Sequence, residues 1–204
     1  KEQEETLRLS VVIPTAGKDP IFPEIPKSLI PVAGRPILDH QLEAIRKSGF
    51  KQIVIVRGHK GEMFNGYSNV TLCDNENYLD AHSLESLMAA VGHMDAGFLL
   101  VYADILFDPA ILGRLINSGK DIVLAIDNSY SYHKHEIDKK LDLVVTKKRF
   151  DAHYRRLQPS QATEIVRVGK EIEAEVADYE FIGLAYFSQQ GAEALRQVYE
   201  RCAG

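Results

Sequence analysis

Short, continuous apolar runs alternate with helical patterns over the first 127 residues. The runs are Leu9–Pro14, Ile53–Val56, Phe98–Tyr102 and Ile122–Ile126, and turn formers such as Gly, Pro or Asp stand close to them. Runs of this length are typical of strands buried in a parallel sheet.

Helical patterns lie between these runs. They cover Asp39–Ser48, which ends at Gly49, then Ser83–Gly92 and Pro109–Ser118, where a proline in the first turn is favourable. An alternation of strands and helices predicts a three-layer α/β sheet.

The pattern changes after Asp127. A polar stretch is followed by three strand-like segments without long helices between them, and then by a final helix over Gln189–Arg201. The segments are Leu141–Thr146, Glu164–Val168 and Phe181–Ser188. We therefore expect one domain with a nucleotide-binding half, residues 1–127, and a mixed-sheet half for the acceptor, residues 128–204.

Composition narrows the classes of partner. The chain has 204 residues, 45% of them hydrophobic, which suffices for one sizeable core. A net charge of -5 and the lack of long apolar stretches argue against nucleic-acid and membrane partners. Two cysteines and no signal peptide favour the cytoplasm. A first residue that is Lys rather than Met is compatible with a piece of a longer protein.

The loop after the first strand carries the first candidate chemistry. Pro14, Thr15, Ala16, Gly17 and Lys18 follow that strand, where small residues let backbone N–H groups approach phosphates. Lys27, preceded by Pro26, can meet the phosphate charge that grows during phosphoryl transfer. The alternative is an ordinary surface turn followed by a proline-rich loop.

The second candidate is Asp104, in the segment L-L-V-Y-A-D-I-L-F over residues 99–107. A carboxylate at the carboxyl end of a buried strand is well placed for Mg²⁺, which takes few protein ligands and several phosphate oxygens. Asp104 could instead cap the helix near Pro109, although Asp108 fits that role better.

The string V-V-I-P-x-A-G-K…P-K-S-L-x-P-V-x-G-R-P-I-L resembles the start of the nucleotidylyltransferases that activate sugar 1-phosphates, phosphocholine and phosphonates. The resemblance implies a Rossmann-like mixed sheet of the nucleotide-diphospho-sugar transferase type, with Lys27 catalytic and Asp104 holding Mg²⁺. The family signature A-A-G-x-G-x-R is incomplete here, because Lys18, Asp19 and Pro20 follow Gly17. The second metal-binding Asp of the family has no counterpart after Ser188.

The string Y-A-D-I-L-F-D is similar to cytidylyltransferase domains joined to phosphoenolpyruvate mutase in phosphonate pathways. That likeness implies CTP as the nucleotide, a small phosphonate as the acceptor, and a mutase domain fused to the chain. By the same resemblance, His82 and Ser83 border the base, while Lys170 and Glu180 contact the acceptor. For the missing metal ligand three alternatives stay open: a tail after Gly204 supplies it, Asp178 or Glu180 substitutes for it, or the domain is incomplete. Arg149, Arg155 and Arg156 add positive charge on the acceptor side.

We therefore expect a Mg²⁺-dependent transfer of CMP to a phosphonate with release of pyrophosphate. Sugar-1-phosphate or phosphocholine nucleotidylyltransferases are the nearest alternatives. A nucleotide-sugar glycosyltransferase fits less well, because Asp104 is not part of an Asp-x-Asp motif. A non-catalytic nucleotide-binding domain of a larger protein is the alternative from a different class.

Overall fold

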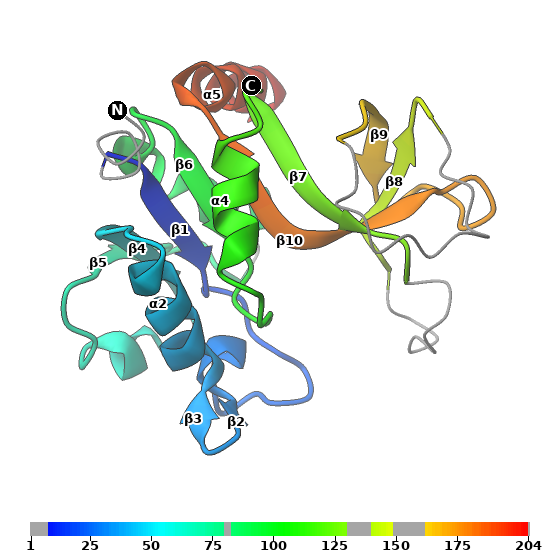
Figure 1. Cartoon of the computed structure of the whole chain (residues 1–204). Helices are drawn as coiled ribbons and strands as arrows, with labels where there is room; N and C mark the ends of the chain where they lie inside the picture. The colour runs from blue at the N-terminus through cyan, green and yellow to red at the C-terminus, as the bar shows by residue number, and fades with distance from the viewer. Residues whose placement is uncertain (1–7, 80–82, 130–139, 149–161, 204) are drawn as a thin grey trace. The chain divides into compact units, whose positions relative to one another are not determined.

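Figure 1 shows the computed structural model of the chain, which describes residues 8–79, 83–129, 140–148 and 162–203. The chain forms two compact units. Unit 1 comprises residues 1–123 and 183–204, and unit 2 comprises residues 124–182. Within the described residues, no helix is both long enough and apolar enough to cross a bilayer.

Unit 1 is built on a sheet with the strand order β5-β4-β1-β6-β10. Its strands are β5 (Thr71–Asp74), β4 (Gln52–Arg57), β1 (Ser10–Pro14), β6 (Phe98–Val101) and β10 (Tyr179–Phe187). The first four run parallel, with Val11 beside Ile53 and Leu99, whereas β10 runs antiparallel to β6. Almost every residue of β1, β4 and β6 is buried, which explains their continuous apolar sequences.

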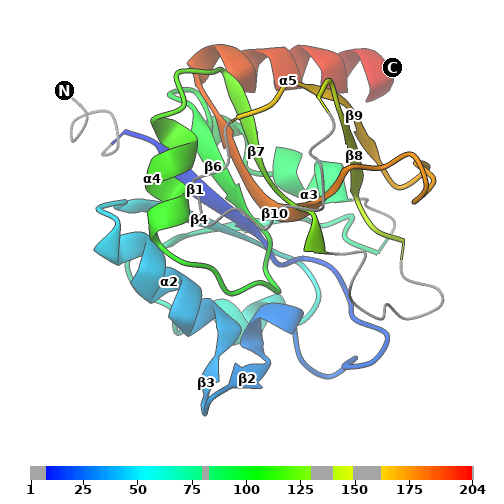
Figure 2. The ribbon, with the colours of Figure 1, turned by 45° about the vertical axis from the view of Figure 1, so that its right-hand side comes forward.

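Helices cover both faces of this sheet. They are α2 (Ile37–Lys47), α3 (Ser83–Met88), α4 (Ala110–Ile116) and α5 (Gln189–Ala203). Figures 1 and 2 place α2 and α4 on one face of the sheet and α3 and α5 on the other. The buried stripe of α2 includes Leu38, Leu42 and Ile45, and each such side chain contributes about 1.5–3 kcal/mol to the free energy of folding. The expected three-layer α/β fold is confirmed.

Several short elements complete unit 1. They are the hairpin of β2 (Pro31–Val32) and β3 (Arg35–Pro36), and the 3-10 turns η1 (Lys27–Leu29), η2 (Gly61–Phe64) and η3 (Val91–His93). The sequence patterns did not predict β5 or the hairpin.

The prediction of a fully buried strand at Ile122–Ile126 is wrong in one respect. The strand exists as β7 (Ile122–Asp127) and pairs with β10, but its residues are half-buried or exposed, and Ile122 is 49% exposed. An apolar run alone does not reveal whether a second layer covers both faces of the strand.

Unit 2 is a small antiparallel sheet. Strand β8 (Leu143–Thr146) pairs with β9 (Ile165–Gly169) and with the first residues of β10, where Tyr179 lies beside Val144. Leu143 and Ile172 form its small core. The chain enters unit 2 along β7 and returns to unit 1 along β10. The pairings of β8 are antiparallel, so the expected mixed character is that of the eight-stranded sheet as a whole, in which β5, β4, β1 and β6 run parallel.

Candidate functional site

The candidate site of unit 1 lies at the carboxyl ends of β1 and β6. Because these strands are parallel neighbours, the loop after Pro14 and the turn after Val101 emerge at the same edge of the sheet. Ligands of open α/β sheets bind at this edge. The sheet therefore brings together the two segments that carry Lys27 and Asp104.

The first part of the loop is fixed to strand β4. Thr15 donates from its backbone N–H (2.7 Å) and from its hydroxyl (2.9 Å) to the carbonyl oxygen of Val56. The carbonyl of Ala16 accepts the N–H of His59 at 2.9 Å. Thr15 and Ala16 are buried, whereas Gly17 and Lys18 are exposed. Gly17 and Lys18 are thus the residues of this loop that face solvent and are open to a ligand.

Lys27 lies between two carboxylates. Its ammonium nitrogen is 3.1 Å from Asp19 Oδ2 and 3.6 Å from Asp104 Oδ2. The side chains of Lys27 and Asp104 are about half exposed, but that of Asp19 is only 7% exposed. The structure therefore joins Lys27 and Asp104, which the sequence pointed to separately, and adds Asp19 to them.

Asp19 is the site residue that sequence reasoning missed as a contributor. Its Oδ1 accepts the backbone N–H groups of Ile21 (2.7 Å) and Phe22 (2.9 Å), and its Oδ2 faces Lys27. The available signal was an acidic residue eight positions before Lys27, in a loop where the family signature predicts Gly and Arg. Asp19 ties the loop that begins at Gly17 to the turn that carries Lys27.

The pKa values of this cluster follow from its contacts. Burial acts to raise the pKa of Asp19, but hydrogen bonds from the Phe22 N–H, Lys27 and the Ile21 N–H outweigh it and lower this pKa. Partial burial acts to lower the pKa of Lys27, but its hydrogen bond with Asp19 and the charge of Asp104 prevail and raise it. Both groups are therefore charged at neutral pH.

The turn that carries Asp104 is attached to two other elements. The Gln41 side-chain amide on α2 donates to the carbonyl oxygens of Tyr102 (2.8 Å) and Ile105 (2.7 Å). The Tyr102 N–H donates to the carbonyl of Gly183 on β10 at 2.9 Å. Asp108 caps helix α4 by accepting the Ala110 N–H at 2.9 Å, so Asp104 is left for another role.

The far side of the loop is attached to the segment after β4. His59 Nε2 donates to the Pro23 carbonyl at 2.7 Å, and the Lys60 ammonium lies 2.8 Å from the Glu24 carboxylate. Both contacts hold the stretch between Asp19 and Lys27.

The Mg²⁺ expected at Asp104 fits the donors found there. Among the described residues, no three His, Cys, Asp or Glu side chains are grouped to hold a metal ion. Asp104 offers one half-exposed carboxylate, which lies beside the side-chain ammonium of Lys27. Such a site suits a metal that takes one or two carboxylates and completes its shell with phosphate oxygens and water.

The other predicted residues divide between the units. Lys170 lies exposed in the turn after β9, and Glu180 is half-buried on β10 opposite Leu143; both belong to unit 2. Asp178, a candidate metal ligand, accepts the Thr146 N–H (2.8 Å) and hydroxyl (3.1 Å). Ser83 is the first residue of α3. His82, Arg149, Arg155 and Arg156 lie outside the described residues.

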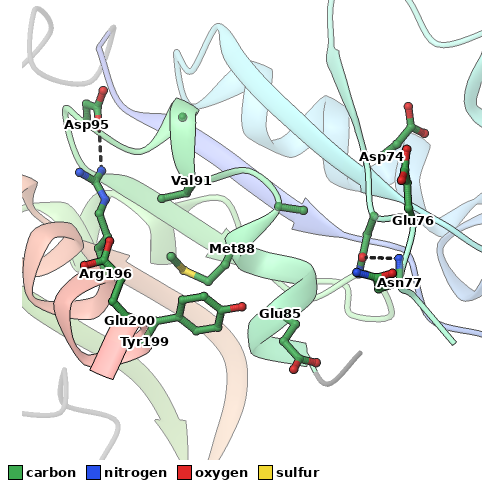
Figure 3. Close-up of a pocket in the computed structure, with 13 residues that line it drawn as sticks. Asp74, Glu76, Asn77, Glu85, Met88, Val91, Asp95, Arg196, Tyr199 and Glu200 are labelled. Carbon is green, nitrogen blue, oxygen red and sulfur yellow. Dashed lines mark hydrogen bonds and ion pairs between the residues drawn. The ribbon is translucent and has the colours of Figure 1, made fainter. Parts of the chain in front are cut away.

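A cavity of about 1020 Å³ lies elsewhere in unit 1, between the segment after β5, α3 and α5 (Figure 3). Its lining includes five acidic residues and one basic residue, Arg196, whose guanidinium is 2.7 Å from Asp95. The acidic residues are Asp74, Glu76, Glu85, Asp95 and Glu200. A lining with this excess of carboxylates repels phosphate groups, so we do not assign the triphosphate to this cavity.

Comparison with known proteins identifies the family to which this part of the chain is similar. The sequence model of the MobA-like NTP transferase domain matches residues 11–133, a span that contains Asp19, Lys27 and Asp104. The solved structure of the inositol-1-phosphate CTP transferase from T. maritima has a TM-score of 0.64 and 16% identity, covering 92% of this chain and 73% of that one. At such low identity the likeness establishes the fold alone.

Two curated proteins are similar in sequence. CTP:phosphoglutamine cytidylyltransferase of Campylobacter jejuni is 22% identical over 194 residues, which are 89% of this chain and 72% of that protein. CMP-5'-(3-aminopropyl)phosphonate synthase of Streptomyces rubellomurinus is 33% identical over 97 residues, which are 44% of this chain and 15% of that protein. Because the family match covers more than half of the chain, the protein belongs to the MobA-like NTP transferase domain family.

Proposed function

We propose that the protein is a Mg²⁺-dependent cytidylyltransferase that transfers CMP from CTP to a small phosphonate and releases pyrophosphate. The observation that carries the proposal is the placement of Lys27 between Asp19 and Asp104 at the carboxyl edge of β1 and β6. The names of both similar proteins refer to CTP or CMP, and one of them to a phosphonate. These names support the cytidylyl and phosphonate parts of the proposal.

The reaction needs no covalent enzyme intermediate. An ionised oxygen of the acceptor attacks the α-phosphorus of CTP in line, a P–O bond forms, and the bond to the bridging oxygen breaks. Its electron pair leaves with pyrophosphate. Since the attacking oxygen of a phosphonate is already ionised near neutral pH, no general base is required. Catalysis then consists of orientation and charge neutralisation.

Lys27 supplies a fixed positive charge to the phosphates. Its raised pKa keeps the ammonium protonated at neutral pH, and Asp19 holds it at the edge of the sheet. The exposed Lys18 is the available substitute for the arginine of the family signature. We assign both lysines to the triphosphate.

Asp104 would hold the Mg²⁺, which when bound neutralises charge on the phosphate oxygens. The Asp104 side chain is half exposed, so a Mg²⁺ ion that also binds phosphate oxygens and water would have access to its carboxylate. We assign the acceptor to Lys170, an exposed cation, and Glu180.

A panel of nucleoside triphosphates and acceptors tests the proposal. CTP, UTP, GTP, ATP and dTTP are each mixed with 2-aminoethylphosphonate, 2-hydroxyethylphosphonate, phosphocholine or glucose 1-phosphate in the presence of Mg²⁺. Pyrophosphate release is measured for the wild-type chain and for Asp104→Ala as the matched control. We expect release that requires CTP, a phosphonate and Asp104.

Other outcomes of the panel select the alternatives. Release with glucose 1-phosphate or phosphocholine alone would replace the phosphonate as acceptor. CTP binding by calorimetry without turnover of any acceptor would instead support a non-catalytic nucleotide-binding domain.

A further inference from the structure

Gln41 is a buried polar residue on the core-facing side of α2. Only 1% of it is exposed, and its neighbours on the helix, Leu38, Leu42 and Ile45, are apolar and buried. Burying an amide is costly unless it forms hydrogen bonds. The presence of Gln at this position of the apolar stripe therefore needs a structural reason.

The side-chain nitrogen of Gln41 supplies that reason. It donates to the carbonyl oxygens of Tyr102 and Ile105, at 2.8 and 2.7 Å, using both of its hydrogens. Its Oε1 has no hydrogen-bond partner in the described structure. The position thus calls for two donors on one atom, which Glu, Met or Leu lacks.

The two acceptors bracket Asp104. Tyr102 and Ile105 stand on either side of the turn Ala103–Asp104, and the Tyr102 N–H is bound to Gly183 on β10. The amide of Gln41 therefore links both ends of this turn to α2. Asp104 is half exposed and its carboxylate lies 3.6 Å from Lys27, so the fold orients this carboxylate through its backbone as well as through that ion pair.

We propose that Gln41 is a positioning residue that orients Asp104 and thereby sets the affinity of the site for its divalent cation. The inference rests on the proposed function, in which Asp104 holds Mg²⁺. Groups that orient a metal ligand typically change metal affinity by about 10–100-fold when they are removed. Gln41 does not touch the metal or the nucleotide in this scheme.

The test uses two variants of similar side-chain volume, Gln41→Met and Gln41→Glu, in the full chain. Mn²⁺ binding is measured by electron paramagnetic resonance with and without CTP, and hydrogen exchange is followed for the backbone amides of residues 103–106. We expect Mn²⁺ affinity to fall by about tenfold and exchange in the turn to accelerate in both variants. With an active wild type, saturating Mg²⁺ should restore most of kcat.

Ile45→Val is the matched control on the same helix. Ile45 is a fully buried, apolar residue of the core. Its change to Val should therefore lower the melting temperature while leaving the Mn²⁺ affinity within about twofold. Unchanged Mn²⁺ affinity in the Gln41 variants would overturn the inference. An equal loss of affinity in Ile45→Val would overturn it as well, since general destabilisation would then suffice.

The measurements separate this inference from the proposed function. If the wild-type chain binds Mn²⁺ through Asp104 but turns over no acceptor, the transferase proposal fails, while the affinities still decide the role of Gln41. If the wild type is active and Gln41→Met binds Mn²⁺ normally, the inference on Gln41 fails alone.

Discussion

The buried carboxylate of Asp19 lies 3.1 Å from the ammonium of Lys27, and accepts two backbone hydrogen bonds on its other oxygen. The Asp19 carboxylate is therefore charged and largely buried, and each of its two oxygens has a partner. This contact connects the loop after β1 to the first residue of η1.

Asp19→Asn should lower the free energy of unfolding by about 1–2 kcal/mol at pH 7, because the hydrogen bonds of Asp19 are made to a charged group. The pKa of Asp19 is lowered from its usual 3.8 in the folded chain, so its contribution is present above pH 3.8. It is lost as the pH falls through the folded pKa. Urea unfolding of both chains at several pH values between 7 and 2.5 measures this. A difference that stays constant below pH 3.8 would contradict it.

Lys27→Ala and Asp104→Ala should each reduce the rate of pyrophosphate release by about 100-fold or more, because each removes a fixed charge from the site. Lys47→Ala is the control, since Lys47 is an exposed cation of α2 paired with Glu43. Steady-state assays should show wild-type rates for the control. Full activity in either site variant would refute the assigned roles.

The two site variants should differ in stability. Lys27→Ala leaves the buried Asp19 without its cation and should cost about 1–3 kcal/mol. Asp104→Ala removes a half-exposed group and should change the free energy of unfolding by no more than about 0.5 kcal/mol. Thermal and urea unfolding measure both. Equal losses in the two variants would argue against a buried, charged Asp19.

Gly183→Ala should be strongly destabilising. Gly183 has a φ of +85°, and a Cβ there would lie 2.7 Å from the Tyr102 side chain. The strained backbone and the clash together should cost about 2–4 kcal/mol. Gly113→Ala in α4 is the matched control, because a Cβ there meets nothing within 4 Å. It should raise stability by about 0.5–1 kcal/mol. Comparable unfolding midpoints for the two variants would show that the β10 backbone at Gly183 tolerates a side chain.

Ala33→Asn should stabilise the β2–β3 hairpin. Ala33 has a φ of +50° and is followed by Gly34 with a φ of +80°, a turn that favours Asn-Gly. We expect a gain of about 0.5–1 kcal/mol in the free energy of unfolding, measured by urea unfolding. A loss of stability would show that the left-handed conformation of Ala33 is not strained.

Much of the fold was predictable because apolar runs and helical stripes mark the segments that form strands and helices. The parallel strands, the four helices and the mixed extension followed from such patterns. Strand β5 did not, because Thr71–Asp74 is short and lies at the sheet edge, where its two end residues are exposed and its two middle residues are only half-buried. Local sequence also could not show that β7 lacks cover on its faces.

The site was predictable only in part, for a physical reason. Lys27 and Asp104 each lie in a segment that can be recognised from its adjacent residues, so the sequence alone identified both as candidates. The roles of Asp19 and Gln41 depend on partners 8 and 61–64 positions away, and only the folded chain reveals those contacts.

Unit 2 is an insertion, because the chain leaves unit 1 after Val123 and re-enters it at Gly183. Asp19, Lys27 and Asp104 therefore all belong to unit 1, in which β6 pairs with Leu184–Phe187 of β10. Under the proposed function, sequence changes within residues 124–182 would alter the acceptor side and leave the three residues assigned to the nucleotide side in place. In that case, a library randomised only in unit 2 would vary the acceptor while the nucleotide donor stays the same.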